Sequence, residues 1–420
     1  MTEEFLHCVW RFKLYTPMLK LIDGEPVSVL NTGDYHQNSG PDFFNARVRI
    51  GNTVWAGNVE IHVNSSDWFR HHHHLDRAYD NLILHVVYRH DKEVLDSNLK
   101  PLATLELRDQ LIDQAWNKYQ SMMASKLWIP CERMISQLET VHMNSWFDRL
   151  MVERLERKSE QVKMALAASG NDWNTAFYRL TAINMGFKLN KEPFERLAAS
   201  ISYPNLLRHS DNLFQIEAML FGQAGMLTGE FEDEYPKALK KEYSFLSRKL
   251  SLSSMDAKTW KFLRLHPGNF PTLRIAQFAA FIHHSQGMIY RLISGDINIE
   301  TLFSSIEVSE YWKNHYRFDK LAVKAGGRLG TEAAHLLCIN LVVPFLFTLG
   351  KNTGRSHFVD MAIEMLGKMK GEVNSVVRKW AEIGMETSSA MQTQALLELK
   401  ARYCERKKCL SCGIGIRLLK

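Results

Sequence analysis

Two runs of alternating apolar and polar residues, joined by Gly51 and Asn52, constrain the fold of this chain most strongly. Residues 43–50 read FFNARVRI, and residues 53–63 read TVWAGNVEIHV. Such alternation is typical of β-strands with one buried face, and a Gly–Asn pair between two of them predicts a hairpin with a two-residue turn. We therefore expect the N-terminal part of the chain to be built around a sheet that contains this hairpin.

The expected hairpin register predicts which side chains share a face. A two-residue turn predicts these pairs: Ile50 with Thr53, Val48 with Trp55, Ala46 with Gly57, and Phe44 with Val59. Glu60 and His62 then lie together on the opposite face, because side chains alternate along a strand. Asp42 starts the other strand beside this pair, although strict alternation places it on the apolar face. Gly40 and Pro41 interrupt that strand, and this break or a bulge could turn Asp42 toward Glu60.

The remaining patterns divide the chain at about residue 110. Before this point the patterns predict a helix at 3–19 and further strands at 27–30, 81–90 and 102–107. After it, apolar residues recur at three- and four-residue spacing, which predicts helices at 109–123, 143–169, 172–186, 192–201, 211–226, 234–250, 271–294, 331–349, 355–369 and 371–401. We expect an α+β fold, with a mixed sheet and flanking helices over 1–110 and a mostly helical region over 111–420.

Asp42, Glu60 and His62 are the candidate catalytic residues. Two carboxylates and an imidazole at one end of a sheet suit a divalent cation, because hard cations such as Mg²⁺ take oxygen ligands. Such a cation can activate water and offset charge on a phosphoryl group. Asp42 and Glu60 would bind the metal, and His62 would orient or deprotonate water. In the alternative interpretation Asp42 caps a turn, and Glu60 and His62 lie on a solvated face of the sheet.

Four consecutive histidines, residues 71–74, follow the hairpin, and His85 lies in the next expected strand. Imidazole is the commonest transition-metal ligand, so His72, His74 and His85 are candidate metal ligands. Asp76 could complete a site with His72 or His74. The alternative is a solvated polar loop, with His85 hydrogen-bonded inside a core.

Three cysteines near the C-terminus have the spacing C-x4-C-x2-C: Cys404, Cys409 and Cys412. This spacing resembles part of a zinc or iron–sulfur site, which normally needs four ligands. Cys131 is the candidate for the fourth ligand. The alternative is three reduced cysteines in a solvated tail.

The composition is that of a soluble globular protein, with 45% hydrophobic and 23% charged residues among 420. A formal net charge of +6 permits a phosphate-bearing partner. The N-terminus begins with acidic residues and predicts no signal peptide, and the apolar run 333–350 predicts a buried helix rather than a membrane span. Six cysteines in so long a chain do not suggest a disulfide scaffold, so we expect a cytoplasmic protein without a membrane partner.

Several longer motifs together resemble a bacterial family catalogued as domain of unknown function 2851. They are SGPDFFNARVRI, WAGNVEIHVNSSDW, NLILHVVYRHD, LHPGNFPTLRIAQ and CLSCGIG. The resemblance spans nearly the whole chain, and it implies no particular activity.

The order helix, three strands, helix, strand over roughly the first quarter of the chain is similar to the core of the PD-(D/E)XK nuclease-like superfamily. The signature would fall on Pro41–Asp42 and on Glu60–Ile61–His62. The resemblance implies that Asp42 and Glu60 hold Mg²⁺ or Mn²⁺, although the superfamily has a lysine where this chain has His62. Some members also hold an iron–sulfur cluster with one upstream cysteine and three near the C-terminus. Cys131 with the three C-terminal cysteines resembles that arrangement.

These observations predict a metal-dependent nuclease that hydrolyses phosphodiester bonds and has nucleic acid as its partner. The first alternative is a non-catalytic module that binds nucleic acid or a protein on a degenerate nuclease-like fold, which the replacement of lysine by His62 would favour. The second alternative is a hydrolase for another substrate with a histidine-rich Zn²⁺ or Mn²⁺ site. The sequence carries no signal for the oligomeric state.

Overall fold

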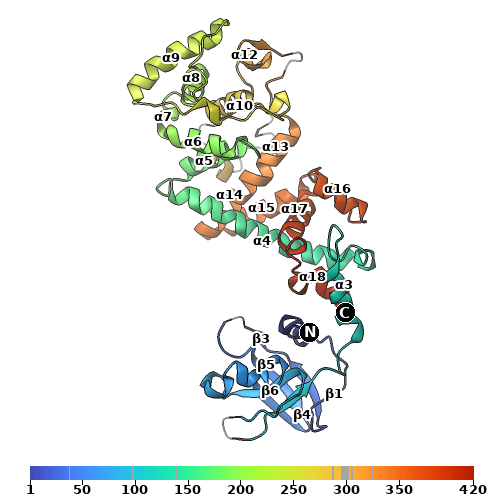
Figure 1. Ribbon diagram of the computed structural model, residues 1–420. Helices are drawn as coiled ribbons and strands as arrows, with labels where there is room; N and C mark the ends of the chain where they lie inside the picture. Colours follow the sequence, from blue (N-terminus) through green and yellow to red (C-terminus); the bar gives the residue numbers. More distant parts are fainter. Residues whose placement is uncertain are drawn as a thin grey trace. The chain divides into compact units, whose positions relative to one another are not determined.

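The computed structural model in Figure 1 describes residues 1–36, 38–96, 99–138, 140–285, 288–294, 302–303, 306–322 and 326–420. The chain forms two compact units. The first unit comprises Met1–Phe147, Lys379–Met385 and Leu397–Lys420, and the second comprises Asp148–Arg378 and Glu386–Leu396. This division differs from the expected boundary at residue 110, because two C-terminal segments return to the first unit.

The first unit contains the expected mixed sheet. Its strands are β1 (Leu19–Lys20), β2 (Pro26–Asn31), β3 (Asp34–Tyr35), β4 (Phe43–Ile50), β5 (Thr53–Asn64), β6 (Leu82–Arg89) and β7 (Thr104–Glu106). They are ordered β1-β2-β4-β5-β6-β7, and β3 pairs with the end of β4. The neighbours from β1 to β5 are antiparallel, whereas β5, β6 and β7 run parallel. The α+β fold class is therefore confirmed.

Short helices flank this sheet: α1 (Glu3–Phe12), α2 (Asp67–Arg70), α3 (Asp113–Ala124) and α18 (Gly413–Leu419). Helix α1 packs on β5 and is shorter than the expected 3–19. It ends because Lys13 adopts a left-handed conformation with φ of 53°, and the backbone N–H of Lys13 donates to the carbonyl of Trp10. Helix α18 packs on α3, which brings the C-terminus into the first unit.

The second unit is mostly helical, as expected. Its helices are α4 (Thr140–Ala167, which begins in the first unit), α5 (Trp173–Met185), α6 (Lys191–Ser200), α7 (Tyr203–Leu207), α8 (Leu213–Gln223), α9 (Glu234–Leu250), α10 (Pro271–His284), α11 (Met288–Ser294), α12 (Glu310–Lys313), α13 (Thr331–Leu337), α14 (Val343–Thr353) and α15 (Ser356–Lys368). The expected helix 271–294 corresponds to α10 and α11, and residues 286–287 between them lie outside the described residues. The expected helix 371–401 is divided into α16 (Ser375–Glu382) and α17 (Ala390–Leu399).

The most apolar helical run, Thr331–Thr353, is long and apolar enough by length and composition to cross a membrane. Its most apolar window of 18 residues is 78% buried inside the protein. Leu337, Ile339, Leu346 and Phe347 from this run belong to the hydrophobic core of the second unit. The run thus forms a core helix of this unit, as a buried apolar segment would.

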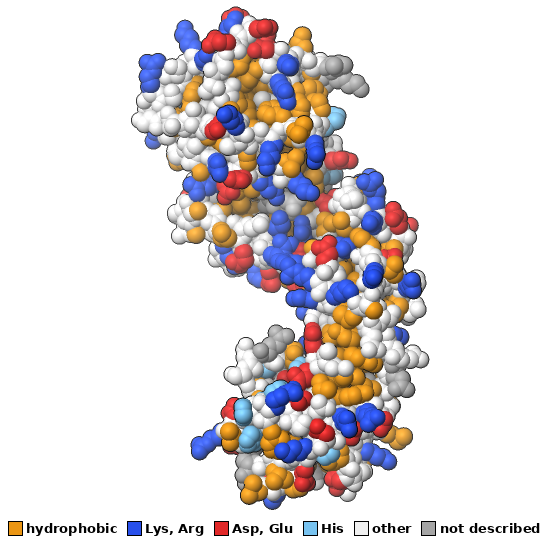
Figure 2. All heavy atoms as spheres, in the orientation of Figure 1, with side chains coloured by type: hydrophobic (Ala, Val, Ile, Leu, Met, Phe, Trp, Pro, Cys, Tyr) orange, Lys and Arg blue, Asp and Glu red, His pale blue; other side chains and the backbone are white. Residues whose placement is uncertain are grey.

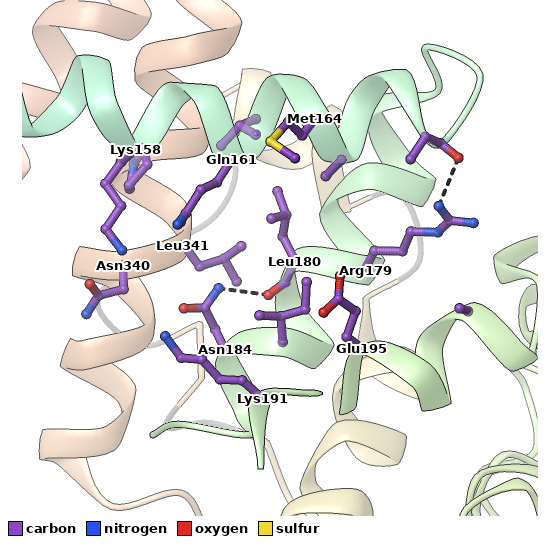
Figure 3. Close-up of a pocket in the computed structure, with 16 residues that line it drawn as sticks. Lys158, Gln161, Met164, Arg179, Leu180, Asn184, Lys191, Glu195, Asn340 and Leu341 are labelled. Atoms are coloured by element: carbon purple, nitrogen blue, oxygen red, sulfur yellow. Dashed lines mark hydrogen bonds between the residues drawn. The ribbon is translucent and has the colours of Figure 1, made fainter. Parts of the chain in front are cut away.

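Acidic and basic side chains are interspersed on the face shown in Figure 2, and a group of histidines lies on the first unit beside acidic side chains. The second unit contains a pocket of about 430 Å³ between α4, α5 and α6, shown in Figure 3.

Glu217 in α8 is a fully buried carboxyl in the second unit. Ser309 donates a hydrogen bond of 3.0 Å to its Oε1, and the Tyr235 hydroxyl donates to its Oε2. Burial raises the pKa of Glu217 to about 7, and these two hydrogen bonds only partly oppose the effect. The carboxyl therefore titrates near neutral pH in the folded protein.

Substitution of Glu217 by Gln should remove a pH dependence of stability. Because the folded pKa of about 7 exceeds the ordinary 4.5, the wild-type carboxyl contributes stability that is fully present below pH 4.5 and is lost as the pH rises through 7. Between about pH 5 and about pH 8, the free energy of unfolding should fall by roughly 2–3 kcal/mol more in the wild type than in Glu217→Gln. Denaturant unfolding at both pH values measures this, and equal falls in the two proteins would contradict the assignment.

Candidate metal centre

The β4–β5 hairpin has the expected register near its turn and a shifted register farther away. The confirmed pairs are Ile50 with Thr53, Val48 with Trp55, and Ala46 with Gly57. The expected pair of Phe44 with Val59 is wrong, because Phe43 lies opposite Val59 instead. Asn45 lies within the shift, has a left-handed φ of 59°, and is the extra residue of a β-bulge.

The bulge brings Asp42 opposite Glu60. Strict alternation had placed Asp42 on the apolar face of the hairpin, and the extra residue moves it to the face of Glu60. The Asp42 N–H donates to Glu60 Oε2 at 3.0 Å, and the Ile61 N–H donates to Asp42 Oδ2 at 2.9 Å. His7 of α1 places its Nε2 3.1 Å from the same Asp42 Oδ2. Asp42 therefore links β4, β5 and α1 through one carboxylate oxygen, and Oδ1 takes no part in these contacts.

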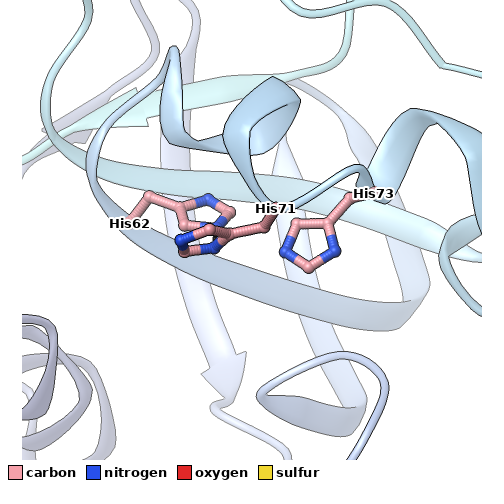
Figure 4. Close-up of side chains that lie close together, drawn as sticks. All are labelled: His62, His71 and His73. Atoms are coloured by element: carbon pink, nitrogen blue, oxygen red, sulfur yellow. Dashed lines mark hydrogen bonds between the residues drawn. The ribbon is translucent and has the colours of Figure 1, made fainter.

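Three histidines, His62, His71 and His73, gather near Glu60, and Figure 4 shows their side chains close together. One ring nitrogen of each lies within 4.8 Å of those of the other two. Glu60 Oε1 lies 3.2 Å from His73 Nε2 and 3.6 Å from His62 Nε2, and His62 Nε2 lies 3.2 Å from His71 Nδ1. His73 Nε2 is buried and makes no hydrogen bond within the described part of the chain. His73 Nε2 therefore has a lone pair or a proton that no partner within the cluster satisfies, and imidazole nitrogens are common ligands of Zn²⁺.

His85 supports the cluster from the adjacent parallel strand β6. It is fully buried, and its Nε2 lies 2.8 Å from His62 Nδ1. If His62 Nδ1 carries the proton and donates it to His85, the lone pair of His62 Nε2 faces the cluster. His85 thus lies behind His62, and its own Nδ1 has no hydrogen-bond partner among the described residues.

His72 and His74, which the sequence suggested as ligands, lie outside this cluster. Both are exposed, and their rings contact each other at 6.2 Å between centroids, while His74 also contacts Phe69. His72 has a left-handed φ of 61°, and a 3₁₀ turn begins at His73. His73 thus lies beside Glu60 and His71 beside His62, and the run of four histidines gave no periodic signal that could have distinguished them.

Burial favours the neutral forms of Glu60, His62 and His73. Burial and then the charge of Asp42 raise the pKa of Glu60 to about 9. Burial and the neighbouring imidazoles lower the pKa of His62 to about 2 and that of His85 to about 3, and burial also lowers the pKa of His73. Neutral imidazole is the form that binds a metal ion.

The donor set fits some cations better than others. Three imidazoles with one carboxylate are typical ligands of Zn²⁺ and other transition metals, whereas Mg²⁺ prefers an all-oxygen shell. His62 is buried, His73 is half-buried, and His71 is exposed. Solvent can therefore reach the centre at His71.

The candidate cysteine ligands also lie within the first unit. They are Cys131 after α3, Cys404 at the end of a π-helical turn (Lys400–Cys404), Cys409 in a 3₁₀ turn (Cys409–Ser411), and Cys412 directly before α18. All four are free thiols, and three of them are buried. Burial is the main effect that raises the pKa of Cys404 and of Cys131. The charges of Cys412, Cys131 and Cys409 raise the pKa of Cys404 further, and the charges of Cys412 and Cys409 raise the pKa of Cys131 further. Such mutual effects require short separations.

A family model described as "Protein of unknown function (DUF2851)" matches residues 3–375. The chain therefore belongs to this family. The match includes the histidine cluster and Cys131, and it ends before the three C-terminal cysteines. No curated protein and no solved structure matches the chain.

The bulge leads to a test by substitution at Asn45. A β-branched residue is strongly disfavoured at positive φ, so Asn45→Val should lower the free energy of unfolding by about 1–2 kcal/mol, whereas Asn45→Gly should be nearly neutral. Arg47→Val is the matched control, because Arg47 is an exposed β4 residue without this conformation. Denaturant unfolding of the three variants measures the differences. Equal costs for Asn45→Val and Arg47→Val would show that the bulge is absent.

Proposed function

We propose that the first unit is a metal-dependent hydrolase that cleaves phosphodiester bonds. Glu60, His62, His71 and His73 would hold the cation, and Asp42 would position Glu60. The observation that carries this proposal is the gathering of three imidazoles within 4.8 Å of one another, with a buried carboxylate oxygen 3.2 Å from one of them.

The donor set favours Zn²⁺ or Mn²⁺ over the Mg²⁺ that an Asp and Glu pair alone would suggest. A bound cation would lower the pKa of a water molecule and offset negative charge on a phosphoryl group. His85 would fix the ring of His62, as partners behind metal ligands commonly do.

Asp42 and Glu60 then have different roles. Asp42 is a positioning residue, because its Oδ2 is already engaged by the Ile61 N–H and by His7. Glu60 Oε1 faces His62 and His73, so it can bind the cation once the carboxyl has lost its proton. His71 is exposed at the centre and can contact an anionic substrate.

The proposed substrate class rests on the net charge of the chain and on the similarity of its strand order to that of the PD-(D/E)XK superfamily. The net charge of +6 and the exposed histidines support an anionic substrate. The placement of Asp42 opposite Glu60 on neighbouring strands is similar to the PD-(D/E)XK arrangement, which supports nucleic acid in particular. A cytoplasmic location would be consistent with that substrate.

Cleavage of nucleic acid should depend on the cation and on the clustered histidines. The purified chain is incubated with single-stranded DNA, duplex DNA and RNA in Mn²⁺, Zn²⁺ or Mg²⁺. We expect cleavage in Mn²⁺ or Zn²⁺, and we expect Glu60→Gln and His73→Ala to reduce the rate at least about 100-fold. Gel-based initial rates provide the measurement.

His74→Ala is the matched control, because it removes an adjacent exposed histidine that lies outside the cluster. It should retain the wild-type rate and the wild-type affinity for the cation. Equal losses in His73→Ala and His74→Ala would contradict the proposed site. Cation binding without any cleavage would instead favour a non-catalytic module, whose nucleic-acid affinity should fall steeply with salt.

We further propose that Cys131, Cys404, Cys409 and Cys412 hold an iron–sulfur cluster. Four sulfurs around one zinc ion at about 2.3 Å would lie about 3.8 Å apart. Among the described residues, no three cysteine sulfurs gather within 4.8 Å of one another, as the histidine nitrogens do. In a [4Fe–4S] cluster each thiolate binds a different iron atom, so such a cluster suits the wider spacing.

Protein purified without oxygen should contain iron and sulfide and should show the broad visible absorbance of a cluster. Cys131→Ser and Cys404→Ser should lose most of both, because each removes one of four ligands. Cys338→Ser is the matched control, since Cys338 is a buried cysteine in the core of the second unit. If the protein contains zinc instead of iron, the proposal of an iron–sulfur cluster is wrong and the cysteines form a zinc site. If Cys131→Ser has the iron content of the wild type, the assignment of Cys131 as a ligand is wrong.

A further inference from the structure

The pocket in the second unit has the size and lining of a small-molecule site. It encloses about 430 Å³ between α4, α5, α6 and the π-helical turn Cys338–Val342. These elements and the start of α14 contribute apolar side chains to it, namely Val162, Ala165, Leu180, Ile183, Leu341 and Pro344. Pockets of this size with a mainly apolar lining and a few convergent polar groups commonly bind small molecules.

The polar groups of this pocket are distributed unevenly. In Figure 3, Lys158, Asn340, Asn184 and Lys191 lie on one side, whereas Glu195 lies on the other side beside Arg179. Glu195 is the only carboxylate among the lining residues. The side with the two lysines therefore has no carboxylate among the lining residues.

The two amides on the lysine side are held by the helices. Asn184 Nδ2 donates to the carbonyl of Leu180 at 2.8 Å, and Asn340 Nδ2 donates to the carbonyl of Leu336 at 3.0 Å. Lys191 is exposed and makes no ion pair with any residue that the structure describes. The exposed ammonium group of Lys191 can therefore receive an anionic group.

The backbone gives an independent indication of function at this position. The π-helical turn interrupts the otherwise α-helical run Thr331–Thr353, and it places Asn340 and Leu341 in the lining of the pocket. Single π-helical turns within α-helices are rare, and they frequently occur at functional sites.

We propose that this pocket binds a small apolar molecule with one anionic group, whose apolar part fills the space beside Leu180 and Leu341. The anionic group, a carboxylate or a phosphate, would lie beside the ammonium group of Lys191. This inference concerns the second unit alone, and it does not depend on the metal centre.

The test compares ligands that share a ten-carbon chain and differ in their head groups. Isothermal titration of the full chain measures the affinities for decanoate, decyl phosphate, decanol and decylamine. We expect decanoate or decyl phosphate to bind at least about tenfold more tightly than decanol, and decylamine to bind most weakly. The ratio between the first two probes distinguishes a carboxylate ligand from a phosphate ligand.

Two kinds of variant assign the binding to this pocket. Ala199→Trp fills the pocket from an exposed lining position and should abolish binding, whereas Ala167→Trp, at an exposed alanine outside the lining, should not. Lys191→Gln should lower the affinity for decanoate and decyl phosphate about tenfold and leave the affinity for decanol unchanged. If circular dichroism shows that Ala199→Trp is misfolded, the Lys191→Gln variant provides the test. Absence of binding, equal affinities for all four probes, or unchanged anion binding in Lys191→Gln would overturn the proposal.

Discussion

Two reciprocal hydrogen bonds between Asp42 and the β5 strand hold the candidate centre together. Each carboxylate accepts an N–H from the other strand: Glu60 from Asp42, and Asp42 from Ile61. These bonds lie where the bulge at Asn45 shifts the backbone ladder, so carboxylates satisfy backbone groups near the interruption. The arrangement orients Glu60 toward the histidines, and every proposed role in the centre depends on it.

The polar groups of the centre lower the free energy of unfolding of the first unit, as is typical of functional sites. Glu60, His62 and His85 are buried, and burial disfavours their charged forms. The buried His85 Nδ1 has no partner in the described part of the chain, and a buried polar group without a hydrogen bond costs about 1–3 kcal/mol. A core that served only packing would be more stable with apolar residues here. The accumulation of imidazoles therefore supports a role in binding rather than in folding.

The sequence predicted the regular elements well and the local exceptions poorly. Alternation and the Gly–Asn turn gave β4 with its observed bounds, and helical spacing gave α9 at 234–250. The conflict of alternation at Asp42 allowed for a bulge, but the sequence could not place it at Asn45, because one left-handed residue leaves no periodic trace. It also chose His72 and His74 over His71 and His73, since a turn, unlike a strand or helix, has no fixed side-chain period.

Long-range packing explains the other differences. The expected boundary at residue 110 rested on local pattern alone, whereas the first unit also takes in α3 and returns at Leu397–Lys420. That return brings Cys404, Cys409 and Cys412 into the unit that contains Cys131. The chain segments that form the first unit are far apart in sequence, so local patterns could not assign them to one unit.

The most direct measurement of the metal centre is anomalous X-ray diffraction from crystals of the full chain soaked in Mn²⁺ or Zn²⁺. Data collected on both sides of the absorption edge of the metal locate the ion without assumptions about activity. We predict a peak bounded by Glu60, His62, His71 and His73, and its loss in His73→Ala. A peak only at His72 and His74, or none among the four residues at a saturating cation concentration, would contradict the site.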